Sequence, residues 1–485
     1  MSFPVILLLC IPGILILLIA ASLIRTLLTP AKKAAYVPAP DPVREKAYAE
    51  KLARMIQAET VSVPGTDQRE KFLAFHRVLE SLFPLVHEKL DKTEIDGNLL
   101  YFWKGKSSSK PVVLMSHQDV VPAEGDWIHP PFSGDITEGK VWGRGASDTK
   151  CSVMAFFQAA EELLAEDFVP ENDVYLSSSC TEEWGGDGCP KLVNELKRRG
   201  VKPWIVIDEG GGIILEPIAG IQGNFAMIGV LEKGVGDIRF IARSDGGHAS
   251  APPKNTPIAR LAAFVHETET HRIFRRKMPA AVAEMFSTLA PYASFPLRWI
   301  FGNLWLFRPV LLQVLPAISP MAGAMIRTTV AFTMQSGSDA FNVLPQEASV
   351  CANMRFIPHQ GMKESLKIMK RLAKKHGLTM GVVSAKDACK PVDTEGEAFG
   401  YLTAAVRETF PGCPYSPYVM TGATDARYYQ EICDNVFRFA PVIYGPEQMK
   451  GMHGLNENIE TVCLPGAVDF YKCVIGSLQR DVEKQ

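Results

Sequence analysis

The sequence predicts an α/β fold in two domains, preceded by an apolar helix at the N-terminus. Short apolar runs typical of buried strands alternate with helical patterns between Leu99 and Val230, as expected for an α/β domain. Several of these runs end in histidine, acidic residues or glycine, at the strand ends where α/β folds place their ligands. The first stretch of the chain, residues 3–24, carries no charge.

The segment Phe3–Ile24 is long enough to cross a membrane as a helix, since twenty-two residues span about 33 Å and a bilayer core is roughly 30 Å thick. It is longer than the apolar core of a signal peptide, and no basic residue precedes it, so an uncleaved anchor is favoured. Cleavage near Ala20-Ala21-Ser22, which would give a secreted protein, stays open. The following Arg25, Lys32 and Lys33 favour a cytoplasmic position for the rest of the chain.

The remaining chain divides into a linker, a main domain in two parts and an inserted α+β lid. The linker contains several prolines, and a helix is expected from Val43 to about Ala58. A strand at residues 236–241 and a helix at Pro257–Thr268 begin the lid. The expected boundaries are 25–42 for the linker, 43–230 for the first part of the main domain, 231–383 for the lid and 384–485 for the second part.

The most informative motif is His117 and Asp119, which directly follow the apolar run Val112–Met115. Alternation along an extended chain puts both side chains on one side. Asp119 can therefore hold one ring nitrogen of His117 while the other nitrogen binds a metal. A His-x-Asp pattern alone also occurs for purely structural reasons. The choice between a metal site and a structural role therefore depends on further segments.

Two acidic segments follow along the chain. Asp148 lies in a glycine-punctuated turn before the helical pattern Val153–Leu164, where a carboxylate can bridge two cations or simply cap the helix. Glu182 and Glu183 end a strand that begins at Val174. Adjacent side chains on an extended chain diverge, so one can bind a metal while the other serves as a base. The alternative for this acidic pair is a solvated loop.

The last two segments are Trp204–Gly212 and Met452–Glu457. The first is another apolar strand that ends in Asp208, which can be a ligand or a turn aspartate. The second offers His453 beside a glycine, and a single distant histidine is often structural.

Taken in order, these five segments resemble the di-zinc peptidase family of aminoacylase-1, carboxypeptidase G and succinyl-diaminopimelate desuccinylase, from about residue 45 to 475. The resemblance implies a zinc-peptidase-like catalytic domain with a dimerisation-type lid. It also implies five ligands for two zinc ions: His117 and Asp208 on one, Glu183 and His453 on the other, and Asp148 between them. Glu182 resembles the general base and Asp119 the partner of His117. Such nitrogen and oxygen donors also suit manganese or cobalt.

The resemblance extends to substrate-handling residues. His248 is similar to the family's histidine that stabilises the oxyanion, commonly in the site of a partner subunit, so a homodimer is allowed. Asn342 and Arg355 resemble residues that hold the substrate, and an arginine can pair bidentately with a carboxylate. Gly422 and Thr424 belong to a turn that is similar to a substrate-binding turn. A capped turn for His248 and a surface charge for Arg355 are the structural alternatives.

Three departures from the family pattern bear on substrate placement. Thr149 stands where relatives often carry a second aspartate, Cys151 where glycine is common, and Asn353 where an acid often precedes the arginine. None of them removes an expected metal ligand.

The lid contains an unusually apolar stretch, residues 295–326, which prolines and arginines interrupt. A second membrane span is not expected there, because of these interruptions. The segment Trp299–Leu315 suits a groove for an acyl chain or an interfacial contact, and a lid core or dimer interface is the alternative. The stretch makes the chain resemble the branch that hydrolyses and forms N-fatty-acyl amino acids.

Composition limits the remaining choices. A formal net charge of −2 over 485 residues gives no electrostatic case for nucleic-acid binding. Ten scattered cysteines, with no Cys-x-x-Cys pair, are expected to be mostly buried thiols. Together with these limits, the resemblance implies an amide hydrolase for N-acyl amino acids, with a dipeptidase as the alternative enzyme. A catalytically silent, membrane-tethered binding protein is the alternative of another class. The side of the membrane stays open, because some relatives are secreted.

Overall fold

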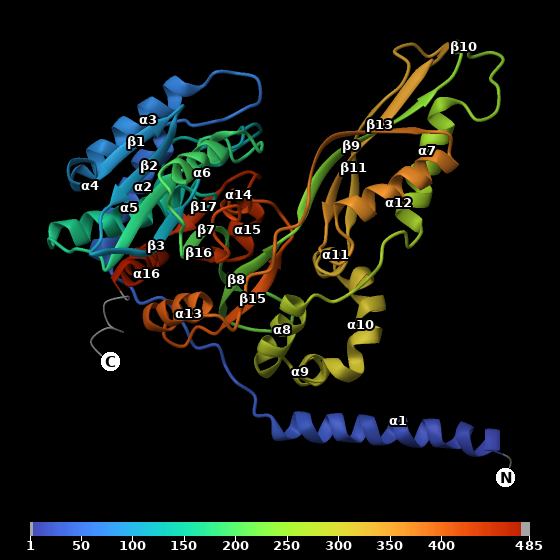
Figure 1. Cartoon of the computed structure of the whole chain (residues 1–485), viewed down its shortest axis with the longest axis horizontal. Helices are drawn as coiled ribbons and strands as arrows, with labels where there is room; N and C mark the ends of the chain where they lie inside the picture. Colours follow the sequence, from blue (N-terminus) through green and yellow to red (C-terminus); the bar gives the residue numbers. More distant parts are fainter. Residues whose placement is uncertain (1–2, 477–485) are drawn as a thin grey trace.

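The computed structural model describes residues 3–476, with side chains from residue 13 onward. A main α/β domain lies beside an elongated lid (Figure 1). The α/β fold predicted from the sequence is confirmed.

An eight-stranded mixed sheet forms the centre of the main domain, in the order β1-β2-β6-β3-β7-β16-β8-β15. Its middle strands β6, β3, β7 and β16 run parallel, so their carboxyl ends meet at one edge. The strands are β1 (Asp91–Ile95), β2 (Asn98–Trp103), β3 (Ser107–Met115), β6 (Asn172–Ser178), β7 (Ile205–Leu215), β8 (Asn224–Glu232), β15 (Tyr415–Met420) and β16 (Val436–Tyr444).

Helices cover both faces of this sheet. One face carries α2 (Pro42–Gln57), α3 (Arg69–Leu82), α4 (Pro84–Lys89), α5 (Lys150–Ala165), α13 (Glu397–Thr409) and α16 (Leu464–Gly476). The other carries α6 (Gly188–Arg198) and α14 (Ala426–Tyr429). The expected first helix begins as α2, where Asp41 accepts a hydrogen bond from the Arg44 backbone N–H and Pro42 occupies the first turn.

A few small elements complete the main domain near the carboxyl edge of the sheet. They are β4 (Ile136–Thr137), β5 (Lys140–Trp142), α15 (Pro446–Gly451), β17 (Asn458–Glu460) and the 3-10 turn η2 (Thr461–Cys463). β17 pairs with β5, so the last part of the chain returns beside the Asp148 turn.

The lid is a four-stranded antiparallel sheet in the order β11-β13-β9-β14, with two helices packed on it around Phe240, Phe264 and Met354. Its elements are β9 (Gly234–Arg243), α7 (Pro257–Thr270), β11 (Thr329–Ser336), β13 (Glu347–Phe356), α12 (Met362–Lys375) and β14 (Thr379–Lys386). A small ribbon of β10 (Gly247–His248) and β12 (Val343–Leu344) forms the tip that lies farthest from the main domain (Figure 1). The lid strand β14 continues three residues past the expected boundary at 383.

A helical layer, inserted between α7 and β11, differs from the sequence prediction. It comprises α8 (Ala280–Leu289), η1 (Ala290–Tyr292), α9 (Phe295–Gly302), α10 (Leu304–Ile318) and α11 (Pro320–Ala324). The prediction assigned these residues to the lid. Their apolar side chains join the core of the main domain instead: α8 lies against β15, and the Phe286 ring stacks on Phe301 with 4.5 Å between centroids.

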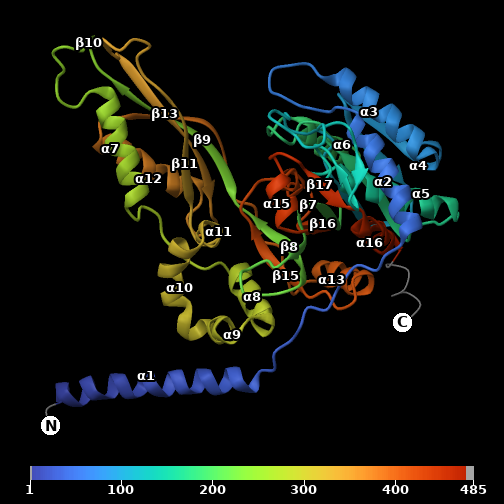
Figure 2. The same cartoon turned by 180° about the vertical axis from the view of Figure 1, so that it is seen from behind.

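The N-terminal helix α1 (Phe3–Leu28) lies beneath this helical layer (Figure 2). Residues 3–12 of the predicted anchor fall outside the described side chains. Within the part that is described, no single helix is both long and apolar enough to cross a membrane; the apolar part of α1 there is Gly13–Leu28, and α9 with α10 would pass only as a pair bent by 106°.

Candidate active site

The site begins at the carboxyl end of β3, where His117 follows the buried strand. Its Nδ1 lies 2.9 Å from the backbone oxygen of Asp119 and 3.4 Å from the Asp119 Oδ1. The Asp119 carboxylate also accepts the backbone N–H groups of Glu182 and Glu183, at 3.1 and 3.2 Å. Asp119 therefore ties the His117 ring to the acidic pair after β6.

Asp148 lies between the two histidines. Its Oδ1 is 3.1 Å from His117 Nε2, and its Oδ2 is 3.1 Å from His453 Nε2. Glu183 Oε2 lies 3.0 Å from the same His453 nitrogen. Ligand atoms of His117, Asp148 and Glu183 all lie within 4.8 Å of one another. One carboxylate thus faces two imidazoles, which is the geometry needed to bridge two cations.

Glu182 lies on the other side of this cluster, with Oε2 4.0 Å from His117 Nε2. Burial raises the pKa of its carboxyl well above the usual value, and nearby acidic groups add to the shift. Burial and the charge of Asp148 also raise the pKa of Glu183 to about 7. Hydrogen bonds to Asp148 and Glu183 raise the pKa of His453 to about 10.

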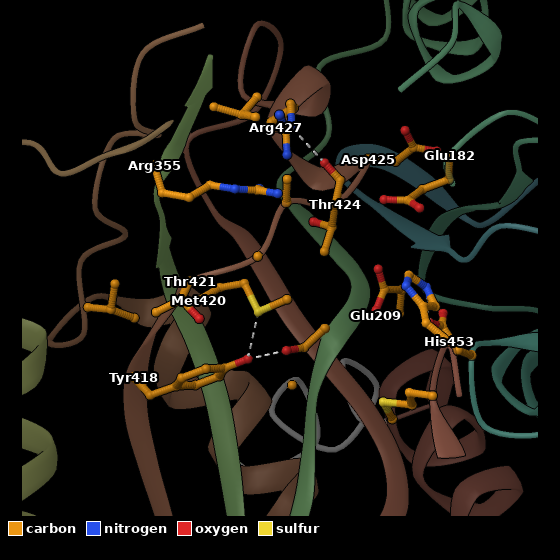
Figure 3. A pocket seen from close by; sticks show the side chains of 18 of the residues that line it. Glu182, Glu209, Arg355, Tyr418, Met420, Thr421, Thr424, Asp425, Arg427 and His453 are labelled. Atoms are coloured by element: carbon orange, nitrogen blue, oxygen red, sulfur yellow. Dashed lines mark hydrogen bonds and ion pairs between the residues drawn. The ribbon is translucent and has the colours of Figure 1, made fainter. Parts of the chain in front are cut away.

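Asp208, another expected ligand, is not among the residues that line the cavity, and neither is His117. β7 continues past Asp208 to Leu215, so Asp208 and Glu209 point to opposite faces of the sheet. Asp208 is buried and accepts the Glu209 backbone N–H at 2.8 Å through Oδ1, while its Oδ2 has no hydrogen-bond partner. Glu209 lines the cavity beside His453 (Figure 3).

Glu457 supports the cluster, although the sequence predicted no role for it. Its Oε2 pairs with Arg144 Nη1 at 2.7 Å, and both side chains are buried. Its Oε1 accepts the backbone N–H groups of Ser147 and Asp148, each at 2.9 Å. The loop that carries His453 is therefore joined to the turn that carries Asp148.

A cavity of about 970 Å³ opens beside these residues, between the main domain and the lid. Arg355 from β13 reaches into it together with Arg427, and Thr424 lies beside them (Figure 3). Gly422 also lines the cavity. The Arg355 Nε donates to Asn353 at 3.0 Å, while its buried Nη1 has no hydrogen-bond partner. Burial, followed by the charge of Arg427, lowers the pKa of Arg355.

The cavity also has an extended apolar wall. It is built by β7, β8, α8 and the region of α11, through Ile214, Ile218, Met227, Met285, Met321 and Met325. The expectation that Trp299–Leu315 shield an acyl chain is not met, since none of these residues lines the cavity. Their buried side chains pack into the main core instead.

His248 and Asn342 lie together at the tip of the lid and do not line this cavity. The Asn342 backbone oxygen accepts the Ala249 N–H at 2.9 Å, and His248 Nδ1 lies 2.7 Å from the Ser250 hydroxyl oxygen. Both residues are exposed. The tip that carries them, at β10, lies at the end of the lid that is farthest from the main domain (Figure 1).

The donor set fits divalent cations. Several carboxylates and only two imidazoles share one cluster, so carboxylates outnumber imidazoles there. Burial, followed by the charges of Asp148 and Asp208, raises the pKa of Glu209 well above its usual value. Nitrogen and oxygen donors without cysteine are typical of catalytic zinc, manganese or cobalt sites.

A metal-binding cluster at the carboxyl edge of such a sheet, facing a cavity that a lid completes, defines a metal-dependent hydrolase. Residues 113–477 match the model of the peptidase family M20/M25/M40, and the chain belongs to this family. The silent binding protein considered from the sequence is thereby set aside.

Relatives of two kinds are similar along most of the chain. The N-fatty-acyl-amino acid synthase/hydrolase PM20D1 of Homo sapiens is 33% identical over 454 residues, covering 90% of this chain and 89% of its own. Probable carboxypeptidase S-like 2 of Dictyostelium discoideum is 32% identical over 445 residues, covering 89% and 85%.

Solved structures agree on the fold. The M20 family metallo-carboxypeptidase Sso-CP2 from Sulfolobus solfataricus superposes with a TM-score of 0.66 at 17% identity, covering 88% of this chain and 98% of its own. Human carnosine dipeptidase 1 gives 0.62 at 15% identity, covering 90% and 98%. The YXEP protein of Bacillus subtilis, a dinuclear metal binding peptidase of the same family, gives 0.55 at 12% identity, covering 90% and 98%.

Replacing Glu457 with glutamine should destabilise the protein and weaken metal binding. The amide keeps the shape but leaves Arg144 as an uncompensated buried charge, which typically costs about 3–5 kcal/mol. We expect a lower midpoint of thermal unfolding and less metal per chain by elemental analysis. Glu447→Gln is the matched control, because Glu447 pairs with Lys140 at 2.6 Å but is half exposed. Equal effects of the two substitutions would contradict the supporting role.

Proposed function

We propose that this protein hydrolyses the amide bond of N-acyl amino acids, with N-fatty-acyl amino acids preferred, and that the reaction is reversible. The observation that carries this proposal is one cavity that combines the metal-binding cluster, a buried arginine and a long apolar wall. The similarity to N-fatty-acyl-amino acid synthase/hydrolases supports it.

The cluster would hold two zinc ions, or manganese or cobalt in the same positions. Asp148 is the bridging ligand in this proposal, His117 serves one ion, and Glu183 and His453 serve the other. Asp208 is the fifth ligand in this proposal, because its buried Oδ2 has no hydrogen-bond partner, and Glu209, which lines the cavity, is the alternative. When bound, the cations would lower the pKa of the attacking water and polarise the scissile carbonyl.

Glu182 would act as the general base. It lies on the cavity wall and is held by the hydrogen bond from its backbone N–H to Asp119. Its carboxylate would take a proton from the attacking water and pass it to the leaving nitrogen. In the reverse direction the same group would accept a proton from the amino group of the amino acid.

The two ends of the substrate would be recognised by different chemistry. The unpartnered Nη1 of Arg355 is available for the free carboxylate of the amino acid, where a guanidinium can bind bidentately. Gly422 and Thr424 would shape the turn beside it. The acyl chain would lie along the methionine-rich wall, where burial of each methylene contributes about 0.8 kcal/mol.

A dipeptidase or carboxypeptidase activity is the second candidate. It is favoured by the similarity to carboxypeptidase S-like proteins and by the fold shared with a carnosine dipeptidase. The same arginine would then bind the C-terminal carboxylate of a peptide. The two candidates differ in the group that lies along the apolar wall, which is an acyl chain in the first and part of a peptide in the second.

We also propose that His248 and Asn342 act across a homodimer. Both are exposed at the lid tip and remote from the cavity of their own chain. In this arrangement they would complete the cavity of the partner subunit, where the imidazole would stabilise the oxyanion.

The segment Phe3–Ile24 is proposed as an N-terminal membrane anchor. Its length and lack of charge support an anchor, and the basic residues that follow it favour a cytoplasmic catalytic domain. A cleaved segment and a secreted enzyme are the alternative.

Single substitutions of Glu182 and Glu183 should have different effects, because Glu182 is the proposed base and Glu183 a proposed metal ligand. Glu182→Gln keeps its shape but cannot accept the proton, so we expect full metal content and a loss of turnover of about a hundredfold or more. Glu183→Gln should lose metal. Elemental analysis and steady-state kinetics check both variants. Equal metal loss in the two would mean that the roles are wrongly assigned.

The assignment of the fifth ligand can be tested in the same way. Asp148→Ala should lose both ions, and Asp208→Asn should lose one, because each removes a donor from the cluster. Glu209→Gln should retain more metal than Asp208→Asn. The reverse order would assign the fifth ligand to Glu209, and a single ion in the fully active wild type would reject the two-metal proposal.

Catalytic efficiency should rise steeply from acetyl to long-chain acyl groups on one amino acid. Four additional covered methylenes favour binding by roughly 3 kcal/mol. Met321→Asp should flatten this series, because it puts a charge into the apolar wall. Met334→Asp, at an exposed lid position outside the cavity, is the control. A flat or falling series in the wild type would instead support the dipeptidase.

A further inference from the structure

Helix α1 is seated on the helical layer through a buried polar cluster. Trp299 Nε1 donates to the Ser22 hydroxyl at 2.8 Å, and Asn303 Nδ2 donates to the Thr26 hydroxyl at 2.9 Å. Ser22, Thr26 and Asn303 are all buried. Both views show α1 running alongside α9 (Figure 1, Figure 2). The position of α1 relative to α9 and α10 is therefore defined by specific contacts.

Helix α10 exposes apolar side chains although its inner face is already filled. Leu304, Leu311 and Leu315 point inward and are buried. On the outer side, Trp305 is 51% exposed, Val310 57% and Ile318 73%. A surface helix of a water-soluble domain normally turns a polar face outward. Described side chains of α1 continue this apolar surface, at Ile14, Leu15, Ile16, Leu17, Ile24, Leu27 and Leu28.

The charged residues around this surface are almost all basic. Residues 271–327 contain seven arginines and lysines and one acidic residue, although the whole chain has a formal net charge of −2. Residues 13–40 contain three basic residues and no acidic one. Arg25 is exposed near the C-terminal end of α1, and Arg308 is exposed on α10. An apolar surface surrounded mostly by basic residues complements the headgroup region of an anionic bilayer.

We propose that the helical layer contacts the membrane beside the point where α1 enters it: the outer faces of α9 and α10 lie in the interface of an anionic bilayer and form one membrane-binding surface with the exposed residues of α1. The surface is thus larger than an N-terminal anchor alone, because the helical layer itself contacts lipid. This surface is defined by Phe295, Trp305, Val310, Val314 and Ile318 together with the exposed residues of α1.

The same layer also builds the wall of the catalytic cavity. Met285 on α8 and Met321 on α11 line the cavity, and α10 connects directly to α11. Resting on the proposed function, the membrane-binding surface would hold the apolar wall next to the bilayer, where long-chain acyl substrates are concentrated.

The test uses full-length protein reconstituted into vesicles that contain phosphatidylserine and brominated phosphatidylcholine, which quenches tryptophan fluorescence within the bilayer. We expect strong quenching in the wild type and loss of a large part of it in Trp305→Phe. Trp127→Phe, in the main domain, should leave the quenching unchanged. If α1 alone anchors the protein, Trp305→Phe and Trp127→Phe would behave alike, and the proposal would be wrong.

A second pair of variants tests the apolar face without changing a fluorophore. Val314→Asp with Ile318→Asp should reduce quenching at least twofold, whereas Val382→Asp with Val383→Asp, at exposed positions of the lid strand β14, should not. Quenching in the wild type should also fall when phosphatidylserine is omitted. Equal quenching by neutral vesicles would contradict the preference for an anionic bilayer. If the wild type dimerises in detergent and the Val314/Ile318 variant does not, the surface would be a dimer interface and not a membrane-binding surface.

Turnover provides a separate readout. The Val314/Ile318 variant should keep its rate on a soluble acetyl amino acid and lose several-fold on a vesicle-bound long-chain substrate. Since the quenching does not depend on turnover, a wrong substrate class would leave the fluorescence result intact. Intact quenching with no activity on any acyl amino acid would reject the proposed function alone.

Discussion

The buried ion pair between Arg144 and Glu457 is the interaction on which the geometry of the active site depends. The two residues are 313 positions apart in the sequence, yet their side chains meet at 2.7 Å without exposure to water. Burying two charges is costly, and further hydrogen bonds to both partners offset part of the cost. Glu457 accepts the N–H groups of Ser147 and Asp148, and Arg144 Nη2 donates to the Gly454 backbone oxygen. As a result, the last part of the chain is held where His453 can meet Asp148.

A second buried carboxylate, Glu232, organises the substrate side in a similar way. It lies at the end of β8, where the chain leaves for the lid, and pairs with Arg438 at 3.1 Å and with Arg427 at 2.7 Å. It also accepts the Thr424 hydroxyl at 3.0 Å. The turn that carries Gly422 and Thr424 is therefore attached to the main sheet, while Arg355 comes from the lid. The cavity is shared by two domains, and neither builds it alone.

Local patterns predicted the strands and most of the cluster, because each ligand except His453 follows an apolar run or a glycine turn. What they missed depends on distances across the fold. The pattern ended a strand at Ile207, but β7 continues to Leu215, and Glu209, which no pattern singled out, lines the cavity. The close passage of β7 beside β16 requires Gly211, where a Cβ would lie 2.2 Å from the Arg438 backbone oxygen. The apolar stretch after Phe295 was recognised, but sequence alone could not show that it packs on the main domain.

The methionine-rich wall of the cavity has a consequence for selectivity. A methionine side chain is unbranched, turns about three bonds and adapts its shape at little cost, so such a wall accepts many apolar outlines about equally well. Discrimination by shape therefore has to come from the rigid end of the cavity, where a planar guanidinium and a hydrogen-bonded turn admit few arrangements. A cavity of this kind combines promiscuity for the flexible part of a ligand with strictness for its charged end.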